Sequence, residues 1–178
     1  NLSTYQPENT FTPTLITEGK TKKIWSTQNE NIVLIENKDT ITAGNGKRVD
    51  EFQNKGVYST TTNANVSEYL NKNGILVAFK SRESDNSFLA EKLTMFPIEF
   101  VVRRRAFGSY LKRHPNVAEG AELPDLVVEM YYKDDANDDP LIEYNPITQI
   151  ATLFKADEPI ETRKPIKTIS LEEIGITG

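Results

Sequence analysis

A strand that carries arginines into a glycine turn constrains the fold of this chain more than any other feature. Residues 96–113 begin with mostly aromatic and β-branched side chains, which favour a strand, and continue into three consecutive arginines before Gly108. Because side chains alternate between the two faces of a strand, Arg103 and Arg105 are expected on one face and Arg104 on the other. The segment therefore predicts a strand that delivers cations into a turn.

Two interpretations of this strand and turn remain open. A guanidinium group binds phosphate or carboxylate through paired hydrogen bonds, and the hydroxyl and backbone N–H of Ser109, near the start of a short predicted helix, could add further donors. That combination indicates an anion-binding site. The alternative is a solvated basic edge, which is the usual environment of arginines near the end of a strand.

The composition excludes several kinds of site. The chain has 178 residues and no cysteine, which excludes disulfides, zinc–thiolate sites and cysteine nucleophiles and fits a reducing compartment. Its single histidine, His114, excludes multi-histidine metal sites, and we expect it to lie at a helix end. The formal net charge of −5 argues against broad binding to nucleic acid or anionic membranes. With no apolar run of membrane-spanning length and no signal-peptide pattern, a cytoplasmic location is expected.

Strand patterns dominate the rest of the chain, and one long helix is expected to pack across them, so we predict an α+β fold. The helix is expected over residues 58–73, and Asn73 and Gly74 would end it. Its candidate core contacts are Val57, Ala64, Val66, Tyr69 and Leu70. Residues 39–56 contain three glycines and are expected to form a long loop. The predicted strands are residues 15–18, 23–26, 32–36, 77–80, 88–93, 98–103, 126–132 and 150–154.

The first predicted hairpin carries the sequence Glu-Gly-Lys-Thr-Lys-Lys at residues 18–23. This is not a Walker A loop, which needs a longer glycine-to-lysine spacing between a strand and a helix. A glycine at a hairpin tip followed by lysines could instead cover nucleotide phosphates, with Lys20 or Lys22 supplying charge. The alternative is a glycine turn with solvated lysines on an edge strand.

Residues 90–97 are a candidate hinge between two lobes. An apolar backbone of this kind can offer an N–H and a C=O to the edge of an adenine, with Lys92 directed at phosphate. The pattern is equally compatible with an ordinary connector between strands.

Two further polar segments carry weaker signals. Asp134, Asp135, Asp138 and Asp139 could supply oxygen ligands for Mg²⁺ or Ca²⁺, but their spacing does not match an EF-hand, and a solvated turn before Pro140 is the more common outcome. Ser170 and Glu173 match the capping box of a helix start, so a helix is expected there, although the chain ends at Gly178. We therefore expect either a fragment of a longer chain or a helical stub.

Six short motifs occur along the chain in a collinear order. They are Glu-Gly-Lys-Thr-Lys (18–22), Thr-Ala-Gly-Asn-Gly (42–46), Asn-Lys-Gly (54–56), Lys-Leu-x-Met-x-Pro-Ile-Glu (92–99), Val-Val-Arg-Arg-Arg-Ala-Phe-Gly-Ser (101–109), and Tyr-Tyr-Lys-Asp-Asp followed by Asp-Pro (131–140). In this order they resemble SAICAR synthetase (phosphoribosylaminoimidazole-succinocarboxamide synthase), a ligase of purine biosynthesis. The resemblance covers residues 15–142.

The resemblance implies a fold and an activity. It implies a two-lobed α+β fold with an antiparallel N-terminal sheet at a nucleotide cleft of the ATP-grasp or kinase type. The expected parts are an extension over residues 1–13, a nucleotide-binding lobe over 14–93, and a partial second lobe over 94–178 that carries the substrate-binding strand. The family uses ATP and Mg²⁺ to join carboxyaminoimidazole ribonucleotide to L-aspartate through an acyl phosphate, releasing ADP and phosphate.

The resemblance also implies roles for individual residues, carried over by position. The expected ATP-binding residues are Gly19, Lys20, Thr21, Lys22, Lys92, Leu93, Thr94 and Met95. The expected substrate-binding residues are Arg103, Ser109, Lys133, Asp139 and Asn45. No catalytic residue is assigned.

One departure from the family pattern concerns the metal. The family's Lys-x-Glu-Phe-Gly and Asp-Glu-x-x-Pro-Asp motifs, which supply metal-binding carboxylates, do not occur in this chain, so no metal ligand is assigned. Small-molecule substrates are the expected partners, without nucleic acid or membrane, and with a homo-oligomer or a complementing C-terminal segment as further possibilities. The alternatives to an active ligase are a truncated or non-catalytic nucleotide-binding module, and a scaffold whose cations are only surface charge.

Overall fold

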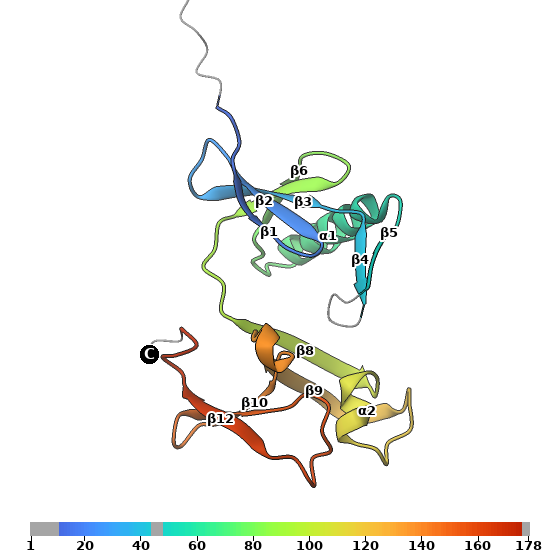
Figure 1. The fold of residues 1–178 in the computed structure, drawn as a ribbon. Helices are drawn as coiled ribbons and strands as arrows, with labels where there is room; N and C mark the ends of the chain where they lie inside the picture. The colour runs from blue at the N-terminus through green and yellow to red at the C-terminus, as the bar shows by residue number, and fades with distance from the viewer. Residues whose placement is uncertain (1–10, 44–47, 176–178) are drawn as a thin grey trace, which may run out of the picture. The chain divides into compact units, whose positions relative to one another are not determined.

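The structure is a computed structural model that describes residues 11–43 and 48–175. The chain forms two compact units, residues 1–94 and 95–178, and each unit has its own antiparallel sheet and hydrophobic core (Figure 1). The α+β class expected from the sequence is confirmed.

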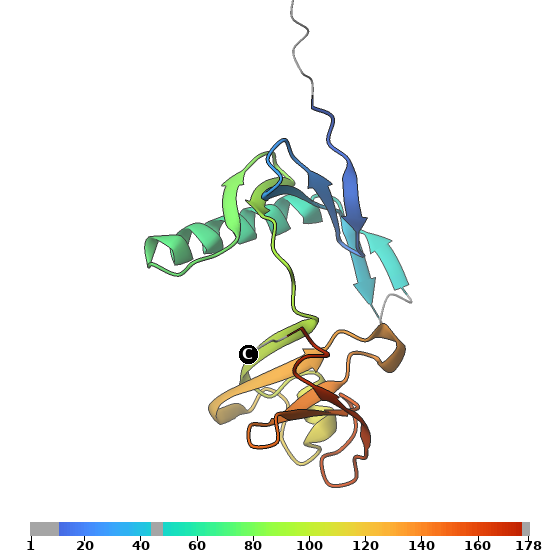
Figure 2. The same ribbon diagram turned by 90° about the vertical axis from the view of Figure 1, so that its left-hand side faces the viewer.

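The first unit is built on a five-stranded sheet with the order β1-β2-β3-β7-β6, in which every neighbouring pair is antiparallel. Its strands are β1 (Leu15–Glu18), β2 (Lys22–Ser26), β3 (Ile32–Asn37), β6 (Phe79–Arg82) and β7 (Ser87–Glu91). Helix α1 (Lys55–Lys72) packs along β3, β6 and β7 (Figure 2). The core between them contains Val33, Ala64, Phe79, Phe88 and Ala90.

Helix α1 meets the sheet through small residues spaced four or three apart. Gly56, Thr60, Ala64 and Ser67 are its buried positions, so the helix backbone approaches closely and the sheet supplies the large aromatic rings. Of the predicted core contacts, Ala64 is therefore confirmed, but Val66 and Tyr69 were wrong, since they are 52% and 67% exposed. No helix in the described ranges is long and apolar enough to cross a membrane.

Polar contacts attach the start of α1 to the end of β3. The carboxylate of Asp39 accepts hydrogen bonds from the backbone N–H groups of Gly56 at 2.8 Å and Asn54 at 3.1 Å. Inside the interface, the side-chain amide of Asn37 donates to the Thr60 hydroxyl at 2.8 Å. The bonds of Gly56, Asn37 and Thr60 satisfy groups of buried residues that would otherwise lack partners.

The prediction of a long loop over residues 39–56 was wrong in part, because this segment contains a hairpin. Strands β4 (Thr40–Ala43) and β5 (Arg48–Glu51) pair with each other and form a separate two-stranded sheet. β-Branched residues at positions 40–42 and 49 suit these strands, but the glycines between them favoured a loop.

The second unit has a five-stranded antiparallel sheet with the order β12-β11-β10-β9-β8. The predicted strands correspond to β8 (Ile98–Arg105), β9 (Glu122–Tyr132) and β11 (Ile150–Phe154), with helix α2 (Ser109–Arg113) after β8. Strands β10 (Leu141–Asn145) and β12 (Pro165–Ser170) and the 3-10 helix η1 (Asp135–Asn137) were not predicted. One core cluster lies around Ile142, Ala151, Leu153, Ile169 and Ile174, and a second is formed by Ala106, Tyr110 and Leu123.

Strand β8 presents different chemistry on its two faces. Phe100 and Val102 lie on one face and are each 61% exposed, whereas Val101 and Arg103 on the other face are partly buried. Val101 pairs with Glu129 of β9, so Glu129 and Arg103 share the inner face. Of the three arginines only Arg103 is partly buried, because the strand register shifts between Arg103 and Arg105 and leaves Arg105 exposed.

The capping box near the C-terminus is present, but residues 171–175, the described residues that follow Ser170, do not form the expected helix. The Ser170 N–H donates to the Glu173 carboxylate at 2.6 Å, and the Glu173 N–H donates to the Ser170 hydroxyl at 3.3 Å. Residues 171–175 then form turns, and Ile174 packs into the core of the unit. A capping box stabilises only the first turn of a helix. Here the packing of Ile174 into the core accompanies a series of turns in place of a helix.

Gly56→Ala should destabilise the first unit despite the better helix propensity of alanine. An added Cβ would lie 2.5 Å from the Asn37 carbonyl oxygen, which real Cβ atoms essentially never do. Overpacking of this kind costs about 1–3 kcal/mol, against about 0.5–1 kcal/mol gained from propensity. Urea unfolding should therefore show a net loss of stability.

Gly19→Ala is the matched control for this prediction, because the nearest atom to its added Cβ is the Lys22 carbonyl oxygen at 4.0 Å. If both variants have the same unfolding midpoint, Gly56 is not required for the close approach of α1 to β3.

Candidate functional site

The glycine hairpin between β1 and β2 is held by Lys38. The Gly19 N–H donates to the Lys22 carbonyl at 2.9 Å, which closes the turn. The Lys38 ammonium then donates to the Glu18 carboxylate at 2.8 Å and to the Gly19 carbonyl at 3.1 Å. The hydrogen bond from Lys38 holds the pKa of Glu18 below its usual value. Lys38 directly follows β3, so these bonds connect the hairpin to the same end of β3 that anchors the start of α1.

A small polar pocket lies between this hairpin and α1. Its volume is about 240 Å³, and its lining comes from the hairpin, β3, α1 and β7. The lining residues are Thr21, Lys22, Asn37, Lys55, Ser59, Asn63 and Phe88. Two ammonium groups, hydroxyls and amides around one small space suit an anion such as a phosphate group.

Sequence reasoning found Thr21 and Lys22 but missed the contribution of α1 to this pocket. Lys55, Ser59 and Asn63 are spaced by four residues, so they lie on one side of the helix. That spacing was readable in the sequence, but nothing in it indicated that this side of the helix lies beside the hairpin.

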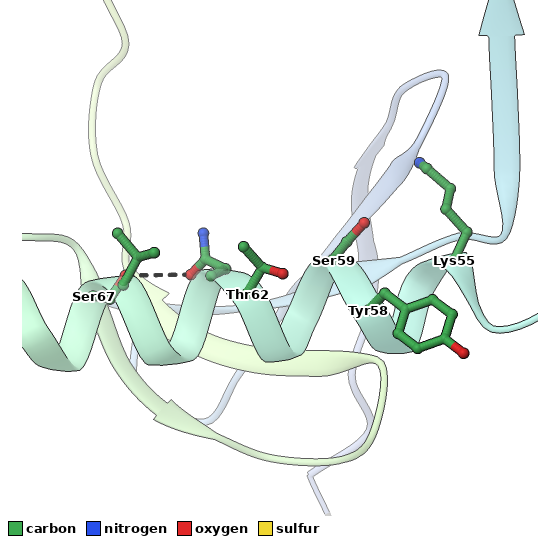
Figure 3. Close-up of a pocket in the computed structure, with 7 residues that line it drawn as sticks. Lys55, Tyr58, Ser59, Thr62 and Ser67 are labelled. Atoms are coloured by element: carbon green, nitrogen blue, oxygen red, sulfur yellow. Dashed lines mark hydrogen bonds between the residues drawn. The ribbon is translucent and has the colours of Figure 1, made fainter.

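A larger pocket of about 520 Å³ runs along α1 (Figure 3). All of its lining residues belong to the helix, and Lys55, Ser59 and Asn63 are shared with the smaller pocket. In Figure 3 the Lys55 and Ser59 side chains project from one side of the helix, and the Tyr58 ring lies toward the other. A ligand held only here would contact a single helix, so the smaller pocket, with walls from four elements, is the better candidate site.

The predicted adenine-binding segment is an irregular stretch at the boundary between the two units. Residues 92–97 adopt no regular secondary structure, and the first unit ends at Thr94 while the second begins at Met95. The Lys92 N–H donates to the Asn31 carbonyl at 2.8 Å. Leu93 and Met95 are 56% and 79% exposed. Their role in holding a nucleotide stays a prediction.

In the second unit, Arg103 belongs to a group of polar side chains of which Arg113, Glu129 and Tyr131 are buried. Its Nε donates to the Glu129 carboxylate at 2.7 Å, and its two terminal nitrogens donate to the Phe107 carbonyl at 3.1 Å and the Ser109 hydroxyl at 3.3 Å. The same carboxylate pairs with Arg113 and accepts a hydrogen bond from the Tyr131 hydroxyl at 2.7 Å. We call this group the arginine cluster; its members are Arg103, Ser109, Arg113, Glu129 and Tyr131.

The charges of the arginine cluster do not cancel. Glu129 is one carboxylate facing two guanidinium groups, so the cluster carries one net positive charge. The Arg113 side chain is 1% exposed and its Nη1 also donates to the Ala156 carbonyl at 2.6 Å, whereas the Arg103 side chain is 16% exposed. The excess positive charge therefore reaches solvent through Arg103, which favours an anionic ligand there.

Ion pairing keeps these groups charged despite their burial. Burial acts to raise the pKa of Glu129, but hydrogen bonds from Arg103 and Tyr131 and the charge of Arg113 outweigh it and lower that pKa. Burial likewise acts to lower the pKa of Arg103, and its hydrogen bond to Glu129 and the negative charge of that carboxylate contribute to raising it overall. At neutral pH Glu129 is therefore an ionised hydrogen-bond acceptor.

The turn beside Arg103 requires glycine. Gly108 has φ 61° and ψ −136°, a conformation that is essentially restricted to glycine. An added Cβ there would lie 4.0 Å from Nη1 of Arg103, an ordinary van der Waals contact, so the backbone conformation and not lack of space requires glycine. The Ala-Phe-Gly-Ser turn of the sequence thus brings Ser109 back to Arg103.

Lys133 and Asp139 lie elsewhere in the second unit. They form an ion pair, which raises the pKa of Lys133, and Asp139 also accepts a hydrogen bond from the Asp134 N–H at 2.8 Å. The Lys133 N–H donates to the Pro97 carbonyl, so this pair lies beside the N-terminal end of β8. Arg103 is five residues further along β8, roughly 17 Å away. The predicted substrate-binding residues therefore form two pairs, and the predicted Asn45 lies outside the described residues.

The acidic turn at residues 134–139 does not fit a metal ion. Asp139 is paired with Lys133, and Asp134 accepts a hydrogen bond from the Asn137 side chain at 2.7 Å. Throughout the described part of the chain, no group of three or more acidic or histidine side chains could hold a metal. These residues consequently give no support for Mg²⁺ coordination within them.

Comparison with known proteins gives a consistent result. The SAICAR synthetase family model matches residues 15–171. A "Probable multifunctional protein ADE2" of Caenorhabditis elegans is 47% identical over 127 residues, which are 71% of this chain and 30% of that protein. The phosphoribosylaminoimidazole-succinocarboxamide synthase of Bacillus subtilis is 40% identical over 162 residues, which are 90% of this chain and 65% of that protein.

Solved structures show the same relationship. The phosphoribosylaminoimidazole-succinocarboxamide synthase of Ehrlichia chaffeensis matches with a TM-score of 0.70 and 34% identity over 73% of this chain. A SAICAR synthetase in complex with ADP matches with a TM-score of 0.68 and 37% identity over 72% of this chain. In both cases the match covers 54% of the solved chain, so this chain spans about half the length of these relatives.

The lowered pKa of Glu129 predicts an acid-sensitive second unit. Its ion pairs stabilise the fold above the ordinary carboxyl pKa of 4.5, and this contribution is lost as the pH falls through the lower folded-state value. Glu129→Gln should cost about 3–5 kcal/mol at neutral pH, because it leaves two guanidinium groups without their counter-charge. The difference from the unsubstituted chain should shrink below pH 4.5 in urea unfolding at a series of pH values.

Glu122→Gln provides the comparison, since Glu122 pairs with Arg105 at 3.3 Å on the surface, with both side chains more than half exposed. It should cost no more than about 1 kcal/mol at any pH. A Glu129 effect that does not change with pH would show that its charge contributes nothing to stability.

Proposed function

The chain belongs to the SAICAR synthetase family, and on that premise we propose that it carries the nucleotide-binding part and one substrate-binding part of an ATP-dependent carbon–nitrogen ligase. The proposed reaction joins carboxyaminoimidazole ribonucleotide to L-aspartate and gives SAICAR, ADP and phosphate, in the cytoplasm. The observation that carries the proposal is the net positive arginine cluster, whose members Arg103 and Ser109 lie in the motif that the family resemblance assigns to substrate.

The nucleotide is assigned to the first unit. Lys20, Thr21 and Lys22 follow the hairpin glycine, and the pocket beside them contains a second ammonium group, that of Lys55. A solved relative with 37% identity is described as a complex with ADP, which supports nucleotide binding here as well. We assign phosphate groups to the hairpin and its pocket, and the base to the exposed backbone at residues 92–94, which end the first unit.

The ribonucleotide is assigned to the second unit. Arg103 offers a guanidinium group beside the Ser109 hydroxyl, and the surplus charge of the cluster would be neutralised by a phosphate or carboxylate. Lys133 and Asp139 form the second polar pair on this unit and would contact another part of the substrates.

The chemistry asked of these groups is mainly positioning and charge neutralisation. The substrate carboxylate oxygen takes the γ-phosphoryl group of ATP, which leaves ADP, and the aspartate amine then attacks the acyl carbon and displaces phosphate. Cations around the phosphates lower the repulsion between the two anionic reactants. When bound, Mg²⁺ would supply further charge neutralisation at the ATP phosphates, with ligands other than the acidic turn at residues 134–139.

A second candidate function is a nucleotide-binding module that lacks ligase activity by itself. The observation that favours it is the polar pocket beside the glycine hairpin, whose lining lies entirely within the first unit. ATP binding without formation of product from ribonucleotide, aspartate and ATP would establish this alternative, and turnover by this chain would exclude it.

Arg103→Lys should weaken binding of the ribonucleotide. Lysine keeps the charge opposite Glu129 but loses the planar fork that can form paired hydrogen bonds. The expected loss is about 1.5–3 kcal/mol, or about 10- to 150-fold in Kd, by calorimetry. Arg105→Lys is the matched control on the same strand, because Arg105 is exposed and bonds to Glu122 and the Gly120 carbonyl. Equal affinities in the two variants would make Arg103 a structural residue only.

Lys20→Ala should weaken ATP binding much more than adenosine binding, because its charge is assigned to phosphate. The expected loss for ATP is about 1.5–3 kcal/mol, the range for a hydrogen bond to a charged group. Calorimetry with both ligands measures the difference, and Lys23→Ala serves as a control in the adjacent strand. Equal losses for ATP and adenosine would contradict the assignment of Lys20 to the phosphates.

A further inference from the structure

The two hydroxyl groups of the arginine cluster form a chain that ends at Glu129. The Tyr131 hydroxyl lies 2.7 Å from the Glu129 carboxylate, the Ser109 hydroxyl lies 3.2 Å from the Tyr131 hydroxyl, and Nη2 of Arg103 lies 3.3 Å from Ser109. Tyr131 is only 6% exposed, whereas Ser109 is partly exposed beside the turn at Gly108. This row of hydrogen bonds thus runs from the surface at Ser109 inward to Glu129.

The direction of every proton in this chain follows from counting donors. An ionised carboxylate can only accept, so the single proton of the Tyr131 hydroxyl is donated to Glu129. Tyr131 then has no proton left for Ser109, and the contact between them requires Ser109 to donate. A guanidinium group can only donate, so Ser109 accepts from Arg103. The hydroxyl proton of Ser109 therefore points inward, away from solvent.

We propose that Tyr131 is a positioning residue for the ligand site: it holds the Ser109 proton inward, so that an anion at Arg103 must compete with Tyr131 for that proton. This inference rests on the proposed binding of an anionic substrate beside Arg103 and Ser109. In this arrangement Ser109 presents a lone pair to the ligand side, and a lone pair repels an anionic oxygen until the hydroxyl rotates. Tyr131 therefore affects how strongly the site at Arg103 and Ser109 binds an anion.

Ionisation of Glu129 is what makes the direction unambiguous. A protonated Glu129 could donate to Tyr131 and reverse the chain, and the two guanidinium groups prevent this by lowering the pKa of Glu129. The charged and titratable groups around the chain are Arg103 from β8, Arg113 from α2 and Glu129 from β9, with Tyr131 itself. Both guanidinium groups act in the same sense on the carboxylate.

Tyr131→Phe tests the proposal, because the proposal predicts tighter ligand binding, whereas a merely structural role predicts equal or weaker binding. Removal of the phenol oxygen releases the Ser109 proton, so carboxyaminoimidazole ribonucleotide should bind about two- to tenfold more tightly, the range for one neutral hydrogen bond. Ser109→Ala should abolish this gain in the Tyr131→Phe background. The neighbouring Tyr132→Phe is the matched control and should leave affinity unchanged. Calorimetry of the four single and double variants measures these effects, with thermal unfolding as a check of the fold.

The outcomes separate the inference from the function on which it rests. Equal or weaker binding by Tyr131→Phe, while the unsubstituted chain binds the ribonucleotide, overturns the role of Tyr131 and leaves the proposed function standing. Failure of the unsubstituted chain to bind the ribonucleotide overturns the proposed substrate site instead.

A measurement without ligand keeps the hydrogen bond between Ser109 and Tyr131 testable in that second case. A double-mutant cycle of Ser109→Ala and Tyr131→Phe on urea unfolding should show coupling, because the two residues share one hydrogen bond. Additive effects would overturn the proposed bond from Ser109 to Tyr131.

Discussion

The second unit depends on one carboxylate, that of Glu129, buried between two guanidinium groups. Through it, β9 is bonded to Arg103 of β8 and Arg113 of α2, and Arg113 extends the network to the Ala156 carbonyl after β11. A buried carboxylate needs such partners, because desolvation alone would neutralise it. Since two cations surround one anion, the network that holds the unit together also leaves a positive charge at its surface. Structure and ligand preference thus share one origin.

The first unit follows a comparable principle, with several polar contacts gathered at one strand end. Asp39 and the pair of Asn37 and Thr60 anchor the start of α1 to the end of β3, and Lys38 from the same strand end holds the glycine hairpin. Small helix residues let α1 approach the sheet, which leaves the lysine and hydroxyl side chains at the start of the helix beside the hairpin. A few polar contacts at one strand end thereby determine which cations line the small pocket.

Much of the secondary structure could be predicted from local signals, and the errors have physical causes. Alternating apolar residues marked β8 and β9, and Gly74, with its positive φ of 77°, marked the end of α1. The buried side of α1 was predicted wrongly around Val66 and Tyr69, because small residues rather than large ones face the sheet. The pattern at Ser170 gave the expected capping bonds without a helix, since propagation of a helix depends on packing that a capping box does not specify.

The sequence by itself determined the local features: a cation-bearing strand that runs into a glycine turn, a glycine–lysine hairpin, and a collinear set of motifs that resembles one family. Only the tertiary structure decided which groups surround the cations. Arg103 is separated from Glu129 by 26 residues and Glu129 from Arg113 by 16, and Lys55 reaches the hairpin pocket from a different element. Strand register and helix docking set such pairings, and both depend on the packing of whole faces, which no short segment of sequence encodes.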